Sequence, residues 1–125
     1  MRDRPLIAIV DDDASICKAL NRLIRSARMD AEVFGSAGEF LEEGESHEPD
    51  CLILDVQMPR MTGLELCSQL AGRASRVPVI FITAHDDASA RETAEDSGAV
   101  AYLRKPFGDQ VLLDAIAAAL KGRGG

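Results

Sequence analysis

The chain has 125 residues, of which 46% are hydrophobic and 28% charged, and its formal net charge is −7. This length and balance fit one globular domain with a substantial core. The negative charge argues against a nucleic-acid-binding surface, which needs clustered Lys and Arg, and no apolar run is long enough to cross a bilayer.

The first half of the chain alternates apolar, β-branched runs with segments whose apolar side chains recur at helical spacing. The runs indicate buried strands, and the spaced segments indicate amphipathic helices. Asp13, turned outward, or Ser15 can cap the first helix, and Ser36 with Glu39 has capping-box spacing at the start of the second. In chain order we expect a strand at 6–10, a helix at 14–27, a strand at 31–34 and a helix at 36–43.

The second half repeats this alternation. The helix over residues 88–97 should be weakly held, because its only apolar side chains are three alanines. The last helix, in contrast, has a stripe of Val, Leu and Ile that can bury far more surface. In chain order we expect a strand at 51–54, a helix at 62–72, a strand at 77–83, a helix at 88–97, a strand at 101–104 and a helix at 108–121.

Strands that alternate with helices throughout predict an α/β fold, in which helices cover both faces of a parallel sheet. Right-handed crossovers make such a sheet doubly wound, and ligands then bind at the carboxyl ends of the strands. We expect one domain over residues 1–121, followed at 122–125 by a flexible tail or the start of a linker.

Polar side chains fall where the expected strands end. Asp11 and Asp12 follow the first strand and Asp55 the third, while Thr83 ends the fourth and Lys105 follows the fifth. Because these strand ends share one edge of the sheet, the side chains should converge on one pocket. Neighbouring carboxylates repel one another, and a hard divalent cation with oxygen ligands, most plausibly Mg²⁺, would offset that repulsion.

Four motifs lie in a characteristic order and spacing: "VDDD" at 10–13, "LDVQMPRMTG" at 54–63, "FITA" at 81–84 and "YLRKPF" at 102–107. Together they resemble the receiver domain of two-component response regulators, and the resemblance spans the whole chain. Each motif alone is common, but the combination is specific. The resemblance implies a flavodoxin- or CheY-like sheet with the strand order 2-1-3-4-5.

The resemblance implies that Asp55 is the phosphoacceptor, whose carboxylate attacks a phosphohistidine and forms an acyl phosphate. It also implies a Mg²⁺ site, which Mn²⁺ could fill instead, with Asp12 and Asp55 as direct ligands. The backbone carbonyl of Gln57 would be the third protein ligand, and Asp11 would act through water. Lys105 would neutralise phosphoryl oxygens during the transfer.

The resemblance further implies a switch made by Thr83 and Tyr102. The Thr83 hydroxyl would bind a phosphoryl oxygen, and the Tyr102 ring would turn inward behind it. The peptide bond between Lys105 and Pro106 would be cis, as is usual in this family. The surface of the last two helices and the fifth strand would then change, with the weak helix at 88–97 as the natural mover.

Each candidate residue also has a simpler interpretation. Asp11 and Asp12 could be solvated acids at the start of a helix, and the others could be ordinary turn, strand and surface residues. Only their convergence on one pocket favours the functional interpretation. For His85 two interpretations stay open, an influence on an attacking water and a solvated loop position.

Three rival classes of function fit the residues less well. A phosphatase that forms an aspartyl phosphate typically has a second Asp two residues after the nucleophile, where this chain has Gln57. A nucleotide-binding module needs a glycine-rich phosphate loop, and none follows any expected strand. The complete acidic set opposes a degenerate receiver that only binds partners. We expect a phosphoacceptor that catalyses its own phosphorylation and slow dephosphorylation, and not an enzyme in the usual sense.

The resemblance implies a sensor histidine kinase or a histidine phosphotransfer protein as the partner, with a phosphorylation-dependent homodimer as a further candidate. The wording of "ITAHDD" and "GAVAYLRKPF" is most similar to receivers attached to helix-turn-helix transcription regulators. A transcriptional output domain is therefore one expectation, and a stand-alone phosphorelay receiver is the other. Direct binding to nucleic acid or membrane is not expected.

The cellular location is predicted from the cysteines and the N-terminus. Cys17, Cys51 and Cys67 are odd in number and form no CxxC pair, which favours reduced thiols in the cytoplasm, each in the core or on a helix surface. The N-terminal stretch lacks the cleavage pattern of a signal peptide. With only two histidines, a zinc site built on His and Cys is not expected.

Overall fold

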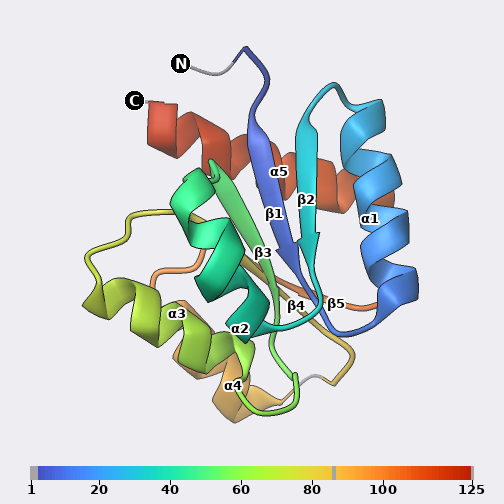
Figure 1. Ribbon diagram of the computed structural model, residues 1–125. Helices are drawn as coiled ribbons and strands as arrows, with labels where there is room; N and C mark the ends of the chain where they lie inside the picture. The colour runs from blue at the N-terminus through green and yellow to red at the C-terminus, as the bar shows by residue number, and fades with distance from the viewer. Residues whose placement is uncertain (1–2, 86, 125) are drawn as a thin grey trace.

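Helices cover both faces of a five-stranded parallel sheet in the computed structural model, which describes residues 3–85 and 87–124 (Figure 1). The strands are β1 (Leu6–Val10), β2 (Asp30–Phe34), β3 (Cys51–Asp55), β4 (Val79–Thr83) and β5 (Ala101–Arg104). The α-helices are α1 (Ala14–Ser26), α2 (Ala37–Glu39), α3 (Gly63–Gly72), α4 (Ala88–Asp96) and α5 (Asp109–Gly124). A π-helical turn, η1 (Phe40–Gly44), and a 3₁₀ turn, η2 (Glu45–His47), follow α2.

The strands lie in the order β2-β1-β3-β4-β5, and every pairing is parallel. The predicted α/β fold and strand order are therefore confirmed. Because all the strands run the same way, their carboxyl ends share one edge of the sheet. β1 and β3 are neighbours there, with β4 and β5 next in line on the β3 side.

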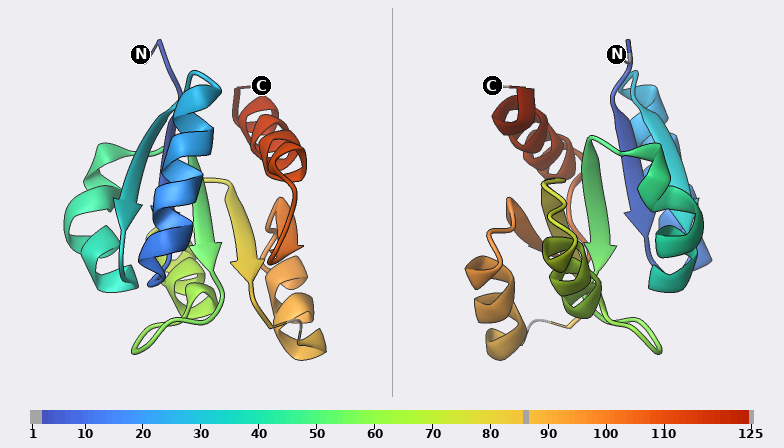
Figure 2. Two further views of the ribbon diagram at one scale, coloured as in Figure 1. Left: turned by 90° about the vertical axis from the view of Figure 1, so that its right-hand side faces the viewer. Right: turned by 60° about the vertical axis from the view of Figure 1, so that its left-hand side comes forward.

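Two hydrophobic cores fill the space between the sheet and its helices. Two further views show α1 and α5 on one face and the remaining helices on the other (Figure 2). Every residue of β1, β3 and β4 is buried, which explains why their sequences are continuous apolar runs instead of alternating ones. The α1 and α5 face buries Ile7, Ile9, Ile53, Ile80, Ile82, Leu20, Ile24, Leu112 and Ile116, and the other face buries Val10, Leu52, Leu54, Phe81, Phe40, Leu66, Leu70 and Ala94.

Side-chain caps begin the helices where the sequence predicts them. The Asp13 carboxylate accepts hydrogen bonds from the backbone N–H groups of Ser15 and Ile16, so Asp13 is the cap of α1. The Ser36 hydroxyl accepts the Glu39 N–H at the start of α2, as predicted, although the Glu39 carboxylate accepts from the Gly35 N–H and not from that of Ser36. Thr62 and Glu65 form a complete capping box at the start of α3, which we did not predict. Each such cap contributes about 1 kcal/mol.

Three element boundaries differ from the expectation by more than one residue. The second helix stops being α-helical after Glu39 and continues as π-helical and 3₁₀ turns. β4 begins at Val79 and not at residue 77, and α5 continues through Gly124, where we expected a tail from residue 122. Within the described ranges, no helix combines the length and apolar character that crossing a bilayer requires.

Candidate functional site

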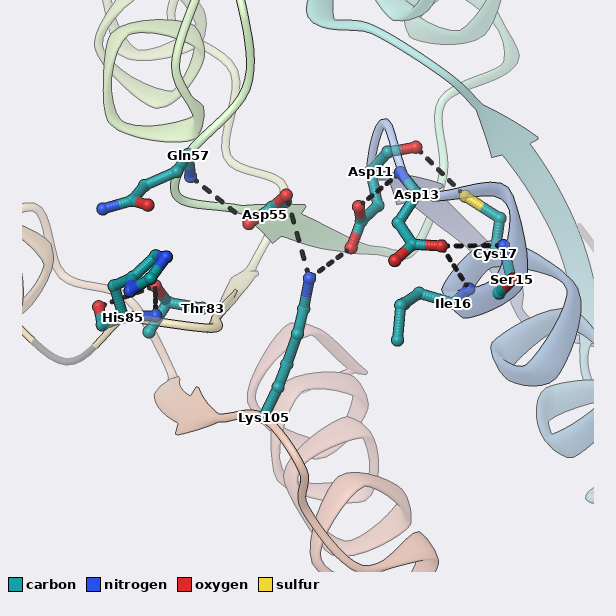
Figure 3. Close-up of polar contacts among 10 residues, drawn as sticks. All are labelled: Asp11, Asp13, Ser15, Ile16, Cys17, Asp55, Gln57, Thr83, His85 and Lys105. Carbon is teal, nitrogen blue, oxygen red and sulfur yellow. Dashed lines mark hydrogen bonds and ion pairs between the residues drawn. The ribbon is translucent and has the colours of Figure 1, made fainter.

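The carboxyl edge of the sheet collects the buried polar side chains of the fold (Figure 3). Asp11 follows β1 and Asp55 ends the adjacent β3, while Thr83 ends β4. Among the residues that the structure describes, these three are the buried polar or charged ones, each 5% exposed or less. Buried polarity is costly unless it is paired, so its concentration at one edge marks a candidate site.

Lys105, which follows β5, reaches across this edge to both buried carboxylates. Its Nζ lies 2.8 Å from Asp11 Oδ2 and 3.8 Å from Asp55 Oδ2. The backbone helps to hold it, because the Lys105 N–H donates to the Thr83 carbonyl at 2.7 Å. The Lys105–Pro106 peptide bond is cis, as predicted. The Lys105 side chain is only 15% exposed, so water and salt screen these charges weakly.

The Asp55 carboxyl is held near the midpoint of its titration at neutral pH. Burial raises the pKa of Asp55 to about 7, and the negative charge of Asp11 acts in the same direction. The positive charge of Lys105 opposes the rise in pKa, as does the Gln57 N–H, which donates to Asp55 Oδ1 at 3.2 Å. A further positive charge at this place would favour the ionised, nucleophilic carboxylate.

The loop after β3 passes very close to the backbone of Asp55. The Gly63 N–H donates to the Val56 carbonyl at 3.0 Å. A Cβ atom at position 63 would overlap the carbonyl oxygen of Asp55, so only glycine fits there without displacing the backbone. This glycine therefore lets α3 begin directly beside the end of β3.

Three carboxylates at the edge could hold a divalent cation. Asp11, Asp12 and Asp55 each offer one oxygen, and these oxygens all lie within 4.8 Å of one another. Asp12 is exposed and the other two are buried, which leaves the cluster open to solvent on the Asp12 side. Oxygen donors of this kind suit a hard cation. Asp13 caps α1 and does not join the cluster, as predicted.

Thr83 lies at the same edge, but its hydroxyl is occupied by its own loop. The hydroxyl donates to the backbone carbonyl of His85 at 2.9 Å and accepts the His85 N–H at 3.1 Å. His85 itself is exposed. A contact between the Thr83 hydroxyl and a group on Asp55 would require the bond to the His85 carbonyl to break.

Tyr102 of β5 points its hydroxyl into the protein. The residue is half-buried and packs against the core that includes Phe81 and Ala94, and its hydroxyl oxygen is buried. The guanidinium of Arg91 from α4 lies over the ring. We did not predict this partner, because no local spacing relates the two residues.

A second contact that the sequence did not predict involves Cys17 of α1. Its Sγ donates to the backbone carbonyl of Asp11 at 3.1 Å and so ties the helix to the acidic segment. Burial raises the pKa of the Cys17 thiol to about 11, with the Asp11 charge as the next cause, so the group is a neutral donor. The predicted core location of Cys17 is right, but the sequence has no signal for the hydrogen bond.

Comparison with known proteins identifies relatives along nearly the whole chain. A family model for the response regulator receiver domain matches residues 7–117. The response regulator protein TodT of Pseudomonas putida is 43% identical over 122 residues, which make up 97% of this chain and 54% of TodT. The transcriptional regulatory protein TdiR of Thauera aromatica is 40% identical over 114 residues, 91% of this chain and 50% of TdiR.

A solved structure agrees in fold. The crystal structure of a CheY-like response regulator receiver domain protein from Methanospirillum hungatei has a TM-score of 0.91 at 25% identity, and the match covers 98% of each chain. The chain spans about half the length of the curated relatives that it matches.

Proposed function

The chain belongs to the family of response regulator receiver domains of two-component systems, and we propose that Asp55 is the residue that receives the phosphoryl group. The observation that carries the proposal is the position of Lys105, whose ammonium lies 2.8 Å from an Asp11 oxygen and 3.8 Å from an Asp55 oxygen. A buried carboxylate beside a fixed cation is an activated nucleophile in a place that can stabilise a transferred anionic group.

In the proposed reaction an Asp55 oxygen attacks the phosphorus of a phosphohistidine on the donor protein. The new P–O bond forms as the P–N bond breaks, and the imidazole leaves with the electron pair. Lys105 is placed to neutralise charge on the phosphoryl oxygens, and the Gln57 N–H can hold the remaining Asp55 oxygen.

The donor set of Asp11, Asp12 and Asp55 supports Mg²⁺ as the cation, with Mn²⁺ as a substitute. When bound, the ion would supply positive charge for the carboxylates and the phosphoryl oxygens. The backbone carbonyl of Gln57 as a further ligand remains a prediction. An acidic cluster that also has to admit a phosphoryl group needs such a charge, because Lys105 alone cannot balance it.

In this proposal the domain acts as a phosphoacceptor and not as a phosphatase. Gln57 occupies the place, two residues after Asp55, where a phosphatase of this chemistry would need its acid. With an amide there, the domain would catalyse its own phosphorylation and lose the phosphoryl group only slowly. The donor would be a sensor histidine kinase or a histidine phosphotransfer protein.

We extend the proposal to a transcriptional output, because the relative TdiR is named a transcriptional regulatory protein. We further propose that phosphorylation leads to a homodimer through α4, β5 and α5. The three free cysteines support a reducing, cytoplasmic setting.

Radiolabelled acetyl phosphate with Mg²⁺ tests the proposal. The wild type should take label, and Asp55→Asn should take none. Asp13→Asn is the matched control, because it also replaces one carboxylate by an amide, next to Asp11 and Asp12 in the sequence, and an Asn can still cap α1. Label on Asp55→Asn, or loss of label in the control as well, would contradict the assignment.

A further inference from the structure

The hydroxyl group of Tyr102 lies in an unfavourable environment. Its hydroxyl oxygen is buried and has no hydrogen-bond partner among the described residues. A buried hydroxyl without a partner is less stable than one that water can reach. If nothing else acted on the side chain, this would favour a ring turned outward, with the hydroxyl in solvent.

The packing around the ring does not lock it in place. Tyr102 is only half-buried, and it lines a cavity of about 230 Å³ between α4 and β5 together with Arg91, Ala94 and Val100. The ring therefore has open space on the side of α4, so its packing against the core holds it inward on one side only.

Thr83 does not hold the ring inward in this structure either. In the proposed switch the Thr83 hydroxyl moves to the phosphoryl group and the ring follows it. Here the Thr83 hydroxyl is still bonded to the backbone of His85, yet the Tyr102 hydroxyl already points into the protein. The inward ring is thus compatible with a Thr83 that has not moved.

Arg91 supplies an attraction of the right kind. Its guanidinium carbon lies 4.9 Å from the centre of the Tyr102 ring, within the range of about 6 Å over which a cation and an aromatic face attract each other. Arg91 belongs to α4, whose described residues bury a single side chain, Ala94. Movement of this loosely held helix would therefore carry the cation away from the ring.

We propose that Arg91 is a positioning residue that holds Tyr102 inward before phosphorylation, so that the place of α4 decides the orientation of the ring. The inference adds a regulatory element to the proposed function and rests on it for its biological meaning, but the contact itself can be tested without any phosphoryl group. Loss of the cation should shift the ring toward the outward position, because it removes one of the attractions that oppose the gain of water by the unpaired hydroxyl.

The chain has one tyrosine and no tryptophan, so its tyrosine fluorescence reports on Tyr102 alone. Acrylamide quenching of that fluorescence would be measured in the unphosphorylated protein. Arg91→Gln should raise the ratio of outward to inward rings about two- to fivefold, which is the bias that a partly exposed cation–aromatic pair supports, and quenching should rise with it. Arg91→Lys keeps the cation and should restore quenching close to the wild-type value.

Arg22→Gln, an exposed position on α1, is the control for the loss of one positive charge and should leave quenching unchanged. Unchanged quenching in Arg91→Gln would overturn the proposal, as would an equal rise in Arg91→Lys or in Arg22→Gln. Labelling of Asp55 by acetyl phosphate, measured on the same variants, separates the two proposals. Normal labelling of the wild type with unaltered quenching in Arg91→Gln would contradict only the role of Arg91. Absent labelling in the wild type would contradict only the proposed function.

Discussion

Asp55 is a carboxyl group in a place that opposes its ionisation. It is 5% exposed, it lies beside Asp11, and the ammonium of Lys105 is closer to Asp11 than to Asp55. The pKa of Asp55 therefore rises to about 7, with burial as the largest cause. This arrangement suits a nucleophile that should react only when a cation is also present.

The raised pKa predicts how stability depends on pH without metal. Between the ordinary pKa of 3.8 and about 7, the folded chain holds a proton on Asp55 that the unfolded chain has lost. Stability from this group is therefore present at low pH and falls as pH rises through that window. Asp55→Asn should remove this part of the dependence of the unfolding free energy on pH. In urea melts the variant should therefore gain more stability over the wild type at about pH 7.5 than at about pH 4.5. An equal difference at both values would mean that the pKa of Asp55 is not raised.

Asp12 should matter for the metal and little for the fold. It is exposed, and burial and the Asp11 charge, not Asp12, raise the pKa of Asp55. Asp12→Ala should abolish the heat of Mg²⁺ binding in titration calorimetry, yet leave metal-free stability within about 0.5 kcal/mol of the wild type or slightly above it. Glu92→Ala, an exposed acid on α4, should keep the binding heat. A clear loss of stability in Asp12→Ala would assign Asp12 a structural role.

At the scale of elements, the sequence predicts what local chemistry determines and misses what distant packing determines. The caps at Asp13 and Ser36 and the apolar runs of the central strands are confirmed, because each depends on neighbouring residues. The π-helical and 3₁₀ turns after Glu39 differ from the prediction. Gly44 lies against the Phe34 and Phe40 rings there, and nothing in the local sequence signals that contact.

The end of α5 shows the same limit in another form. Glycine is a poor helix former, so the glycines after Lys121 predict an early end to the helix, but the helix continues through Gly124. At the site, the strand-end residues could be predicted from their places in the sequence. The contacts of Cys17 with Asp11 and of Arg91 with Tyr102 could not, because they join separate elements.

The junction between β3 and α3 gives a prediction with a matched control. In Gly63→Ala the new methyl group would overlap the Asp55 carbonyl, and relieving that overlap should cost roughly 1–3 kcal/mol in urea unfolding. Gly72→Ala adds the same methyl group at the end of the same helix, where nothing lies within 4 Å. It should be neutral or stabilising by up to about 1 kcal/mol. Equal effects at both positions would show that the close approach at Gly63 is not what requires glycine.

At the scale of the whole molecule, the strand order creates the site. Asp11 and Lys105 are 94 residues apart in the chain, and they meet because β1 and β5 are both parallel members of one sheet. The Lys105 side chain spans the end of β4 to reach β3 and β1, so any shift of β5 along β4 would move the ammonium relative to both carboxylates. The position of the Lys105 ammonium at the site therefore depends on the position of β5.

Stability is unevenly distributed between the helices on either side of β5 in the chain. α5 buries Leu112, Ile116 and Ala119, whereas α4 buries Ala94 alone. At about 25 cal/mol per Å² of apolar surface, α4 is held far less firmly than α5. Elements of low local stability open first and are the natural movers in a two-state transition.

A phosphoryl mimic should therefore change the α4–β5 side and little else. Beryllofluoride with Mg²⁺ bound at Asp55 would attract the Thr83 hydroxyl away from the His85 carbonyl, which disturbs the loop that leads into α4. Amide hydrogen exchange, compared with and without the mimic, should change mainly in residues 84–106, while the buried face of α5 keeps its protection. Asp55→Asn should show no such change, because its amide cannot take the acyl-phosphate-like adduct. If protection instead changes only in α1 and residues 31–45, the signal leaves the site on the opposite side of the sheet, and the route through Thr83 and α4 is wrong.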